Sequence, residues 1–247
     1  LPPVETIAAE ILAAAERSQA LAGTKVVVAA GPTHEPIDPV RFVGNRSSGR
    51  MGFAVARAAR ARGAEVVLVA GPTSLARPFG VRRVDVTTAA QMREAVLEES
   101  REAHVVVMTA AIAGHRPEEA AGEKLAHKGQ PFALRMIPNP DVLAELVGRR
   151  EGGTLPADTT IVGFAAETSD AVARAAEKRE RKGCDLIFAN DVSAPGAGFE
   201  GDTNVVTPIG PAGPEQTWPL ISKRQVAERL WDRVAAHRSE VLGLGER

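Results

Sequence analysis

The sequence predicts an α/β fold of the Rossmann-like, doubly wound type, with a mainly parallel central sheet. The apolar runs 25–30, 65–70 and 105–111 are continuous rather than alternating, as in parallel strands that are buried on both faces. Segments with helical periodicity at 51–62 and 88–103 alternate with these runs. The first two runs also end alike, in Gly-Pro-Thr, which indicates successive βα units.

The composition is that of a globular protein with a sizeable core, since 44% of the 247 residues are hydrophobic and 25% are charged. A formal net charge of -1 disfavours a general nucleic-acid or membrane-surface role. No apolar run approaches the roughly 20 residues of a membrane span and no signal peptide is recognised, so we expect a cytoplasmic protein. Cys184 is the only cysteine, which excludes an internal disulfide and predicts a small buried core residue.

Two parts are expected along the chain, a linker helix over residues 1–22 and one Rossmann-like domain over residues 23–247. Within the domain the periodicity fails at about 112–130. Long connections of this kind are usually functional, so this stretch is predicted to be a flap. A short strand over 132–137 is expected to follow it.

The remaining elements continue the alternation of strands and helices. Asn139 is a plausible N-cap for the helix after the flap, with Pro140 at its first position. The other predicted elements are a strand at 161–166, a helix at 171–182, a strand at 186–189, a small β-rich addition around 204–207 and an amphipathic helix at about 222–242.

The glycine turn, residues 44–52, is the stretch most suggestive of function. Its glycines allow positive φ and close approach of a ligand, and it leads into a helix whose first N–H groups attract anions. The break at 31–33 lies at the carboxyl end of the first strand, where open α/β sheets bind ligands. Alternatively, Ser47 and Ser48 merely cap the helix. The turn matches neither the dinucleotide fingerprint nor the P-loop.

Lys178 and Lys182 are four residues apart, and therefore lie on one face of the predicted helix 171–182. They either complement the negative end of the helix dipole as solvated side chains or form a local phosphate-binding cluster. Spacing alone favours the solvated interpretation.

Several motifs, in their order along the chain, resemble the phosphopantothenate-cysteine ligase family, also called phosphopantothenoylcysteine synthetase. The matching segments are 31–41, 45–52, 108–111, 139–141, 163–168 and 189–192. In bacteria this family is the C-terminal half of a bifunctional coenzyme A biosynthesis protein whose other half is a flavin-dependent decarboxylase. The start at Leu1 and the segment Pro2-Pro3-Val4-Glu5 resemble the junction between the halves.

The resemblance implies a ligase that joins 4'-phosphopantothenate to L-cysteine. CTP is attacked at its α-phosphorus by the pantothenate carboxylate, giving an acyl-cytidylate and pyrophosphate, and the cysteine amine then displaces CMP. Mg²⁺ is the implied cofactor and a homodimer the implied assembly. Base selection is expected to rest on backbone contacts, so the sequence leaves CTP or ATP open.

The resemblance also implies roles for particular residues. Asn45 engages the acyl group and Lys124 on the flap contacts phosphate, so both are catalytic candidates. The implied nucleotide-binding residues are Met108, Ala110, Ala111, Pro140, Asp141, Val142, Leu143, Phe164, Lys178 and Lys182. The implied substrate-binding residues are Gly31, Thr33, Ser47, Ser48 and Gly49.

Two departures from the family pattern concern the metal and the flap. Gly114-His115 replaces the usual Asp-aromatic pair, so the metal ligands stay unassigned, and the flap has only Lys124 and Lys128 in place of a lysine-rich run. Two other functions remain open. A dinucleotide-dependent oxidoreductase would need a Gly-x-Gly-x-x-Gly after the first strand, and a nucleotide-binding or assembly half without turnover would follow if Gly114 prevents catalysis.

Overall fold

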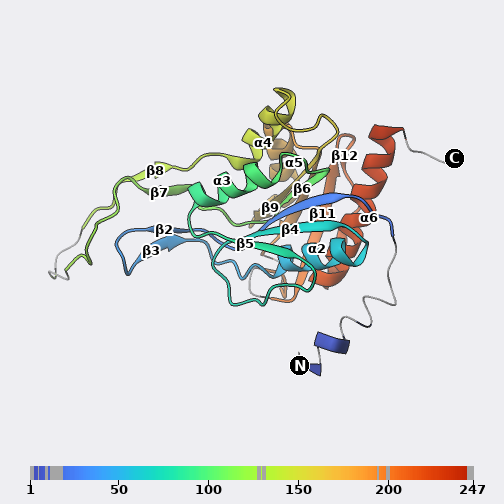
Figure 1. The fold of residues 1–247 in the computed structure, drawn as a ribbon. Helices are drawn as coiled ribbons and strands as arrows, with labels where there is room; N and C mark the ends of the chain where they lie inside the picture. The colour runs from blue at the N-terminus through green and yellow to red at the C-terminus, as the bar shows by residue number, and fades with distance from the viewer. Residues whose placement is uncertain are drawn as a thin grey trace.

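The fold is that of a computed structural model (Figure 1). It describes residues 3, 4, 6–8, 11, 19–126, 129, 132–193, 195–198 and 201–243. The linker helix expected over residues 1–22 falls largely outside the described residues and stays a prediction.

A nine-stranded, mainly parallel sheet runs through the centre of the domain in the order β12-β11-β10-β9-β6-β1-β4-β5, with β13 pairing β11. The strands from β10 to β5 are parallel, whereas β11 runs antiparallel to β10 and pairs with β12 and β13. The predicted fold class is therefore confirmed. The strands are β1 (Lys25–Ala30), β4 (Glu65–Ala70), β5 (Arg82–Asp85), β6 (Val105–Met108), β9 (Thr160–Glu167), β10 (Leu186–Asp191), β11 (Thr203–Gly210), β12 (Gly213–Pro214) and β13 (Trp218–Ser222).

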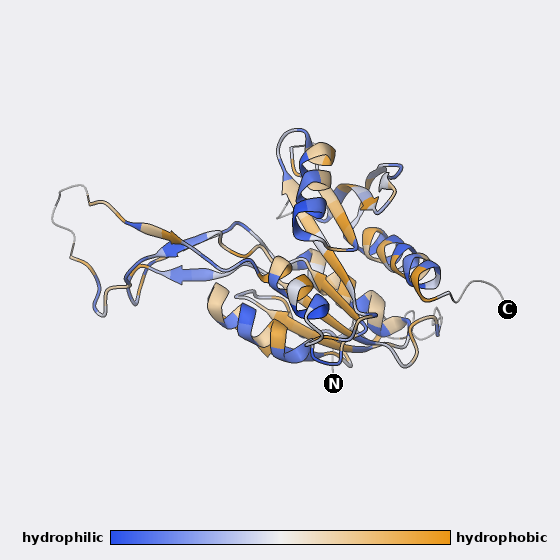
Figure 2. Cartoon of the chain, turned by 90° about the horizontal axis from the view of Figure 1, so that it is seen from above, coloured by the Kyte–Doolittle hydropathy of each residue, from blue (hydrophilic) through white to orange (hydrophobic). Residues whose placement is uncertain are grey.

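Helices cover both faces of the sheet (Figures 1 and 2). One face packs against α2 (Arg50–Ala61) and α6 (Lys223–Leu242), the other against α3 (Ala89–Glu99), α4 (Val142–Glu151) and α5 (Ala171–Lys182). Alternate residues of β1 enter the two hydrophobic clusters, which explains its continuous apolar run. The fully buried Trp231 joins the two helices of the first face, because its Nε1 donates to the Val55 carbonyl at 3.0 Å.

The order of the strands reverses at β1, which has β4 on one side and β6 on the other. Such a switch point opens a crevice outside the carboxyl ends of the two strands. The loops that leave β1 and β6 are tied together there, since Ala111 N donates to Gly31 O at 2.9 Å and Ala113 N to Thr33 Oγ1 at 3.0 Å. The topology therefore places the glycine turn and the segment after β6 close together, at the carboxyl ends of the central strands.

Two antiparallel hairpins form an arm that projects from the body of the domain (Figure 1). The first pairs β2 (His34–Pro36) with β3 (Phe42–Gly44), and the second pairs β7 (His115–Pro117) with β8 (Met136–Pro138). Ala121 N donates to Ile37 O at 2.9 Å between them. The connector after residue 33 and the flap thus have secondary structure that the sequence analysis did not predict, and the strand expected over 132–137 is wrong in extent.

The residues at which α4 and α2 begin differ from those expected from the sequence. Asp141, not Asn139, is the N-cap of α4, because its side chain accepts from Ala144 N at 3.2 Å. Asn139 Nδ2 instead donates to the Ala113 carbonyl at 2.8 Å. The N-cap of α2 is Gly49, with φ 77°, so neither Ser47 nor Ser48 occupies the N-cap position of that helix.

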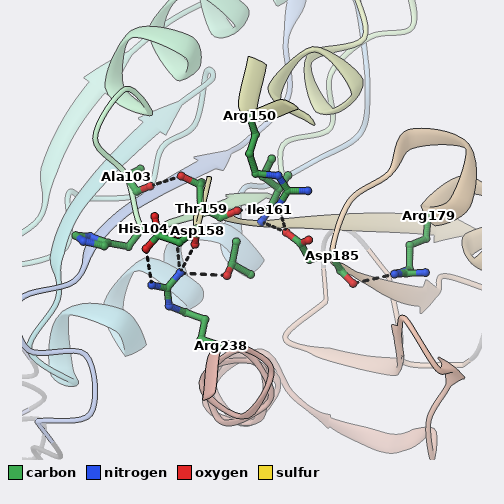
Figure 3. Close-up of polar contacts among 10 residues, drawn as sticks. Ala103, His104, Arg150, Asp158, Thr159, Ile161, Arg179, Asp185 and Arg238 are labelled. Carbon is green, nitrogen blue, oxygen red and sulfur yellow. Dashed lines mark hydrogen bonds and ion pairs between the residues drawn. The ribbon is translucent and has the colours of Figure 1, made fainter. Parts of the chain in front are cut away.

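Arginine side chains hold the strands and helices together at the amino ends of the strands, opposite the crevice (Figure 3). Arg238 of α6 donates to the carbonyls of His104 at 2.6 Å and Asp158 at 2.9 Å, and Arg150 of α4 pairs with Asp185 at 2.5 Å. These contacts lie at the amino ends of β6, β9 and β10, away from the crevice. Cys184, beside these contacts, is 1% exposed and burial raises the pKa of its thiol to about 11, as expected of a core cysteine.

The packing of α2 on the sheet predicts that Gly52→Ala is destabilising. A Cβ at Gly52 would lie 2.3 Å from Thr109 Oγ1 and 2.4 Å from the Ala30 Cβ, so the helix would have to shift. We expect a loss of about 1–3 kcal/mol in the free energy of unfolding, measured with urea. Gly148→Ala is the matched control, since that exposed helical glycine has open space around it and should gain about 0.5–1 kcal/mol. Equal effects of the two variants would contradict this packing.

Burial of His237 predicts a pH dependence of stability. The side chain is 5% exposed, its Nδ1 has no hydrogen-bond partner among the described residues, and desolvation lowers its pKa. The unfolded chain therefore binds a proton more readily, so stability is complete above pH about 6.5 and falls as the pH drops through the lower folded pKa. Urea midpoints at pH 7.5 and 5.5 should differ less for His237→Leu than for the wild type. The exposed His115→Gln should keep the wild-type difference.

Candidate functional site

A pocket of about 310 Å³ opens at the carboxyl ends of β6 and β9, and we call it the nucleoside pocket after the role predicted for its residues. This volume is that of a small-molecule site. All predicted nucleotide-binding residues except Ala111 line it, together with four residues that the sequence analysis did not assign. The lining is Met108, Ala110, Ile112, Ala113, Gly114, Asn139, Pro140, Asp141, Val142, Leu143, Phe164, Lys178 and Lys182.

Two lysines of α5 supply the positive charge of the nucleoside pocket. Lys182 forms an ion pair with Asp141, and the Lys182 side chain is only 14% exposed. Lys178 Nζ donates to the Phe164 carbonyl at 3.4 Å. Burial lowers the pKa of Lys178 and the neighbouring Lys182 lowers it further. Both lysines are half-buried pocket residues rather than solvated charges at a helix end.

Asp141 contributes a carboxylate that stays ionised in this setting. Burial raises its pKa, but the hydrogen bonds from Lys182 and from Ala144 N outweigh burial, and the net shift is downward. A phosphate that bound Lys182 would compete with Asp141 for the ammonium. The ion pair therefore holds Lys182 at the wall of the pocket.

Gly114 lines the nucleoside pocket, and a Cβ built there meets nothing within 4 Å. The usual family aspartate would therefore fit at this position. Among the described residues there is no group of three or more His, Cys, Asp or Glu side chains that could hold a metal ion.

A second, smaller pocket of about 60 Å³ lies beside the first, and we call it the anion pocket after the ligand predicted for the glycine turn. Phe164 lines both pockets, and the glycine turn with the first turn of α2 forms one wall. Predicted substrate residues Ser47, Ser48 and Gly49 are brought together here. The full lining is Ser47, Ser48, Gly49, Arg50, Met51, Gly52, Thr109, Phe164, Ala165, Ala166, Asn190, Gly198, Asn204 and Lys223.

Three buried polar residues of the anion pocket were not assigned a role from the sequence. They are Asn190 on β10, Asn204 on β11 and Lys223 at the first position of α6. A lysine at a helix start opposes the helix dipole, and this misplacement was the one sequence signal that could have singled out Lys223. Asn204 gave no such signal, because only the pairing of β11 with β10 brings it to the site.

Gly31 and Thr33, also predicted to bind substrate, line neither pocket. Thr33 is fully buried and its hydroxyl accepts from Ala113 N. Gly31 has φ 81°, and a Cβ there would lie 3.1 Å from the Gly71 carbonyl oxygen. Both residues hold the loops of the switch point together.

The two catalytic candidates lie outside the pocket linings. Asn45 is exposed, and its Nδ2 donates to the carbonyls of Ala111 at 3.0 Å and Ile112 at 3.2 Å. To donate to a substrate oxygen, the amide must give up one of these acceptors. Lys124 is exposed on the arm, next to Leu125, whose N–H and carbonyl bond the Asp38–Arg41 pair. The structure therefore does not bring Lys124 to the pockets of its own chain, and Lys128 lies outside the described residues.

Curated relatives are bifunctional proteins of coenzyme A biosynthesis. The CoaBC protein of Mycolicibacterium smegmatis is 44% identical over 247 residues, which is 96% of this chain and 59% of the relative. The CoaBC protein of Escherichia coli K12 is 40% identical over 218 residues, which is 87% of this chain and 52% of the relative. The chain thus spans between half and three-fifths of the length of these relatives. No helix among the described residues is long and apolar enough to cross a membrane.

Solved structures have the same architecture. The crystal structure of the C-terminal domain of CoaBC superimposes with a TM-score of 0.74 at 34% identity, over 90% of this chain and all of that one. A Cab2 mutant in complex with phosphopantothenate-cysteine has a TM-score of 0.72 over 91% of this chain and 89% of that one, and at 16% identity it shows the fold alone. The family model for the DNA/pantothenate metabolism flavoprotein C-terminal domain matches residues 21–237. This chain belongs to that family.

Proposed function

We propose that this chain is a phosphopantothenate-cysteine ligase that joins 4'-phosphopantothenate to L-cysteine and consumes CTP. The observation that carries the proposal is the junction of a nucleoside-sized pocket holding Lys178 and Lys182 with an anion pocket at the start of α2. The bifunctional coenzyme A relatives support the substrate class. The Cab2 complex supports it by analogy, because that protein of the same fold binds the product phosphopantothenate-cysteine.

In the first step a carboxylate oxygen of phosphopantothenate attacks the α-phosphorus of CTP. The bond to the bridging oxygen of the β-phosphate breaks, and pyrophosphate leaves with the electron pair. Transfer of this kind depends on positioning and on neutralisation of charge. The protein has a net charge of -1, so its overall charge does not attract a triphosphate. Lys178 and Lys182 supply the positive charge locally, in the pocket.

In the second step the cysteine amine attacks the acyl carbon of the cytidylate, and CMP leaves. Asn45 is proposed to hold the acyl oxygen, because a neutral amide can donate to it without attracting the negatively charged phosphate. Its present acceptors, the carbonyls of Ala111 and Ile112, lie on the segment that leads from β6 to the nucleoside pocket. Asn45 is thereby tethered to a wall of the site.

Mg²⁺ is proposed as the counter-ion of the triphosphate. Because the described residues offer no cluster of metal-ligating side chains, we assign no protein residue to it and derive no step from it. A Mg²⁺ ion that is bound to substrate phosphates commonly keeps several of its waters, so it needs few protein ligands.

Assembly follows from the family as a proposal. We infer a homodimer, and a flavin-dependent decarboxylase half in the parent chain, because the family resemblance implies both and the relatives are named as bifunctional proteins. The arm exposes Val40, Phe42 and Phe132, and exposed apolar side chains of this kind favour a partner surface. Lys124 on the arm would then act after the arm closes on its own site or reaches that of a second copy.

The proposal is tested by pyrophosphate release from the purified protein with phosphopantothenate, Mg²⁺ and either CTP or ATP. Release that requires phosphopantothenate is the expected result, and the better nucleotide identifies the natural one. Binding of CTP without any release, from folded protein, would favour a binding half without turnover, for which the open position at Gly114 is the specific argument.

Asn45→Ala should block formation of phosphopantothenoylcysteine and leave the fold intact. Because the side chain is exposed, its loss should change the urea midpoint little. Loss of an oxyanion-holding donor costs about 10²–10³-fold in kcat. Asn45→Asp is the matched control for size, and it should be as inactive because it lacks the donor. Near-normal product formation by either variant would remove Asn45 from the mechanism.

Lys178→Met should raise the KM for CTP by about ten- to hundred-fold, since a charge-assisted hydrogen bond to phosphate is lost inside the pocket.

Lys124→Met should instead lower kcat while CMP alone binds with unchanged affinity, because Lys124 stands on the arm and not in the pocket. Steady-state kinetics and calorimetry with CMP separate the two. Weakened CMP binding in Lys124→Met would place this lysine in the nucleoside pocket.

A further inference from the structure

The nucleoside pocket offers few polar side chains to a nucleobase. The polar side chains in its lining are those of Asn139, Asp141, Lys178 and Lys182. Asp141 is bound to Lys182 and accepts from Ala144 N at 3.2 Å, and the two lysines are assigned to phosphate in the function proposed above. The hydrogen-bonding edge of a nucleobase in this pocket therefore meets mainly main-chain groups.

Two chain segments form one wall of the pocket where the β7–β8 hairpin leaves the domain (Figure 1). Ala113 and Gly114 precede β7, Asn139 follows β8, and we call these three residues the main-chain wall. Asn139 N donates to the Gly114 carbonyl at 2.9 Å, and Asn139 Nδ2 donates to the Ala113 carbonyl at 2.8 Å. Because a Cβ at Gly114 would meet nothing within 4 Å, these bonds, and not side-chain packing, hold Gly114 in place.

Arg116 on β7 determines which way the Asn139 amide points. Its Nη1 donates to Asn139 Oδ1 at 3.0 Å and to the Pro138 carbonyl at 2.9 Å. A guanidinium has only donors, so the amide must turn its oxygen towards Arg116 and its NH2 group towards the Ala113 carbonyl. With the amide reversed, both side-chain bonds would be lost. Arg116 therefore fixes the main-chain wall through Asn139.

We propose, resting on the function proposed above, that Arg116 and Asn139 are positioning residues that give the nucleoside pocket its preference among nucleobases. Arg116 orients the Asn139 amide, and the amide holds the main-chain groups of Ala113 and Gly114 in place against the nucleobase. A site that reads a substrate by hydrogen bonds rejects a different pattern of donors and acceptors. It does so only while its own groups keep their positions, which depends on the residues that support them.

The phosphate end of the pocket is held by other contacts. Lys178 donates to the Phe164 carbonyl and Lys182 is paired with Asp141, and both lysines come from α5. Loss of Arg116 should therefore leave the phosphate-binding charges in place. A loosened main-chain wall lowers the affinity for the preferred nucleotide towards that for the others, whereas a lost phosphate contact lowers all affinities alike.

Calorimetric binding of CMP, UMP and AMP to the purified protein tests the assignment. Cytosine carries an amine donor where uracil has a carbonyl acceptor, so the ratio of the CMP and UMP affinities reports hydrogen-bond reading directly. In Arg116→Met the affinity for the nucleotide that the wild type prefers should fall by about ten-fold, with the other two nearly unchanged. Arg135→Met is the matched control, because Arg135 lies on the same arm, pairs with Glu118 and does not line the pocket. It should change none of the three affinities.

Variants of Asn139 test whether the two residues act in sequence. Asn139→Asp keeps the shape and the acceptor for Arg116 but removes the donor to the Ala113 carbonyl, so the preference should be lost although Arg116 is present. Asn139→Ala should lose the preference to the same extent. The double variant Arg116→Met/Asn139→Ala should lose no more than Asn139→Ala alone, because both changes act on one wall.

The pattern of the three affinities decides the outcome. Equal falls for CMP, UMP and AMP in Arg116→Met would make Arg116 a phosphate contact or a purely structural residue and would overturn the assignment. Equal affinities in the wild type would overturn it as well, and pyrophosphate release that depends on phosphopantothenate would still support the ligase. If the wild type bound none of the three and released no pyrophosphate from CTP or ATP, the proposed function would fail, and this inference with it.

Discussion

The reversal of strand order at β1 is the constraint on which the rest of this structure depends. Because β4 and β6 flank β1, the loops after β1 and β6 diverge from one point, and a crevice opens between them. The bonds of Ala111 N to Gly31 O and of Ala113 N to Thr33 Oγ1 set its width. The glycine turn reaches this crevice because α2 packs so closely on the sheet that only a glycine fits at residue 52. Both pockets are therefore consequences of topology and close packing before any ligand is considered.

Charge is arranged differently at the two ends of the parallel strands. We call the side where the strands begin the amino edge and the side where they end the carboxyl edge. At the amino edge, arginines such as Arg150 are paired with carboxylates and backbone carbonyls, and their contribution is to stability. At the carboxyl edge, Lys178 and Lys223 are buried or half-buried and donate to backbone carbonyls, and Lys182 is held by a single aspartate. Lys178 and Lys223 stand where water solvates their charge poorly, and this desolvation lowers the pKa of both side chains. Such charge is strongly attractive to an anion, and the proposed function uses it to bind phosphates and carboxylates on a nearly neutral protein.

The sequence was informative wherever local pattern and tertiary role coincide. The runs that became β1, β4 and β6 are buried on both faces, so their continuous apolar composition was sufficient. Arg82–Asp85 was missed as a strand because an edge position requires no apolar residues. The arm was missed because three-residue strands carry too little periodicity to recognise. In the site, the family resemblance selected nine of the residues that line the nucleoside pocket. Lys223 and Asn204 were not found from the sequence. Their place in the anion pocket depends on burial beside α2, which the packing of α6 gives to Lys223 and the antiparallel pairing of β11 gives to Asn204.

The most direct test of a site at the switch point is a titration of the isotope-labelled protein with CMP, followed by backbone amide chemical shifts. The largest changes are predicted for the amides of the nucleoside pocket, at Ala110, Gly114, Leu143 and Phe164. The charged pocket at the amino edge, lined by Lys25, Glu65 and Arg82, should remain unchanged. Changes centred on that amino edge, or no saturable change at the carboxyl ends of β6 and β9, would contradict the location of the site and the mechanism built on it.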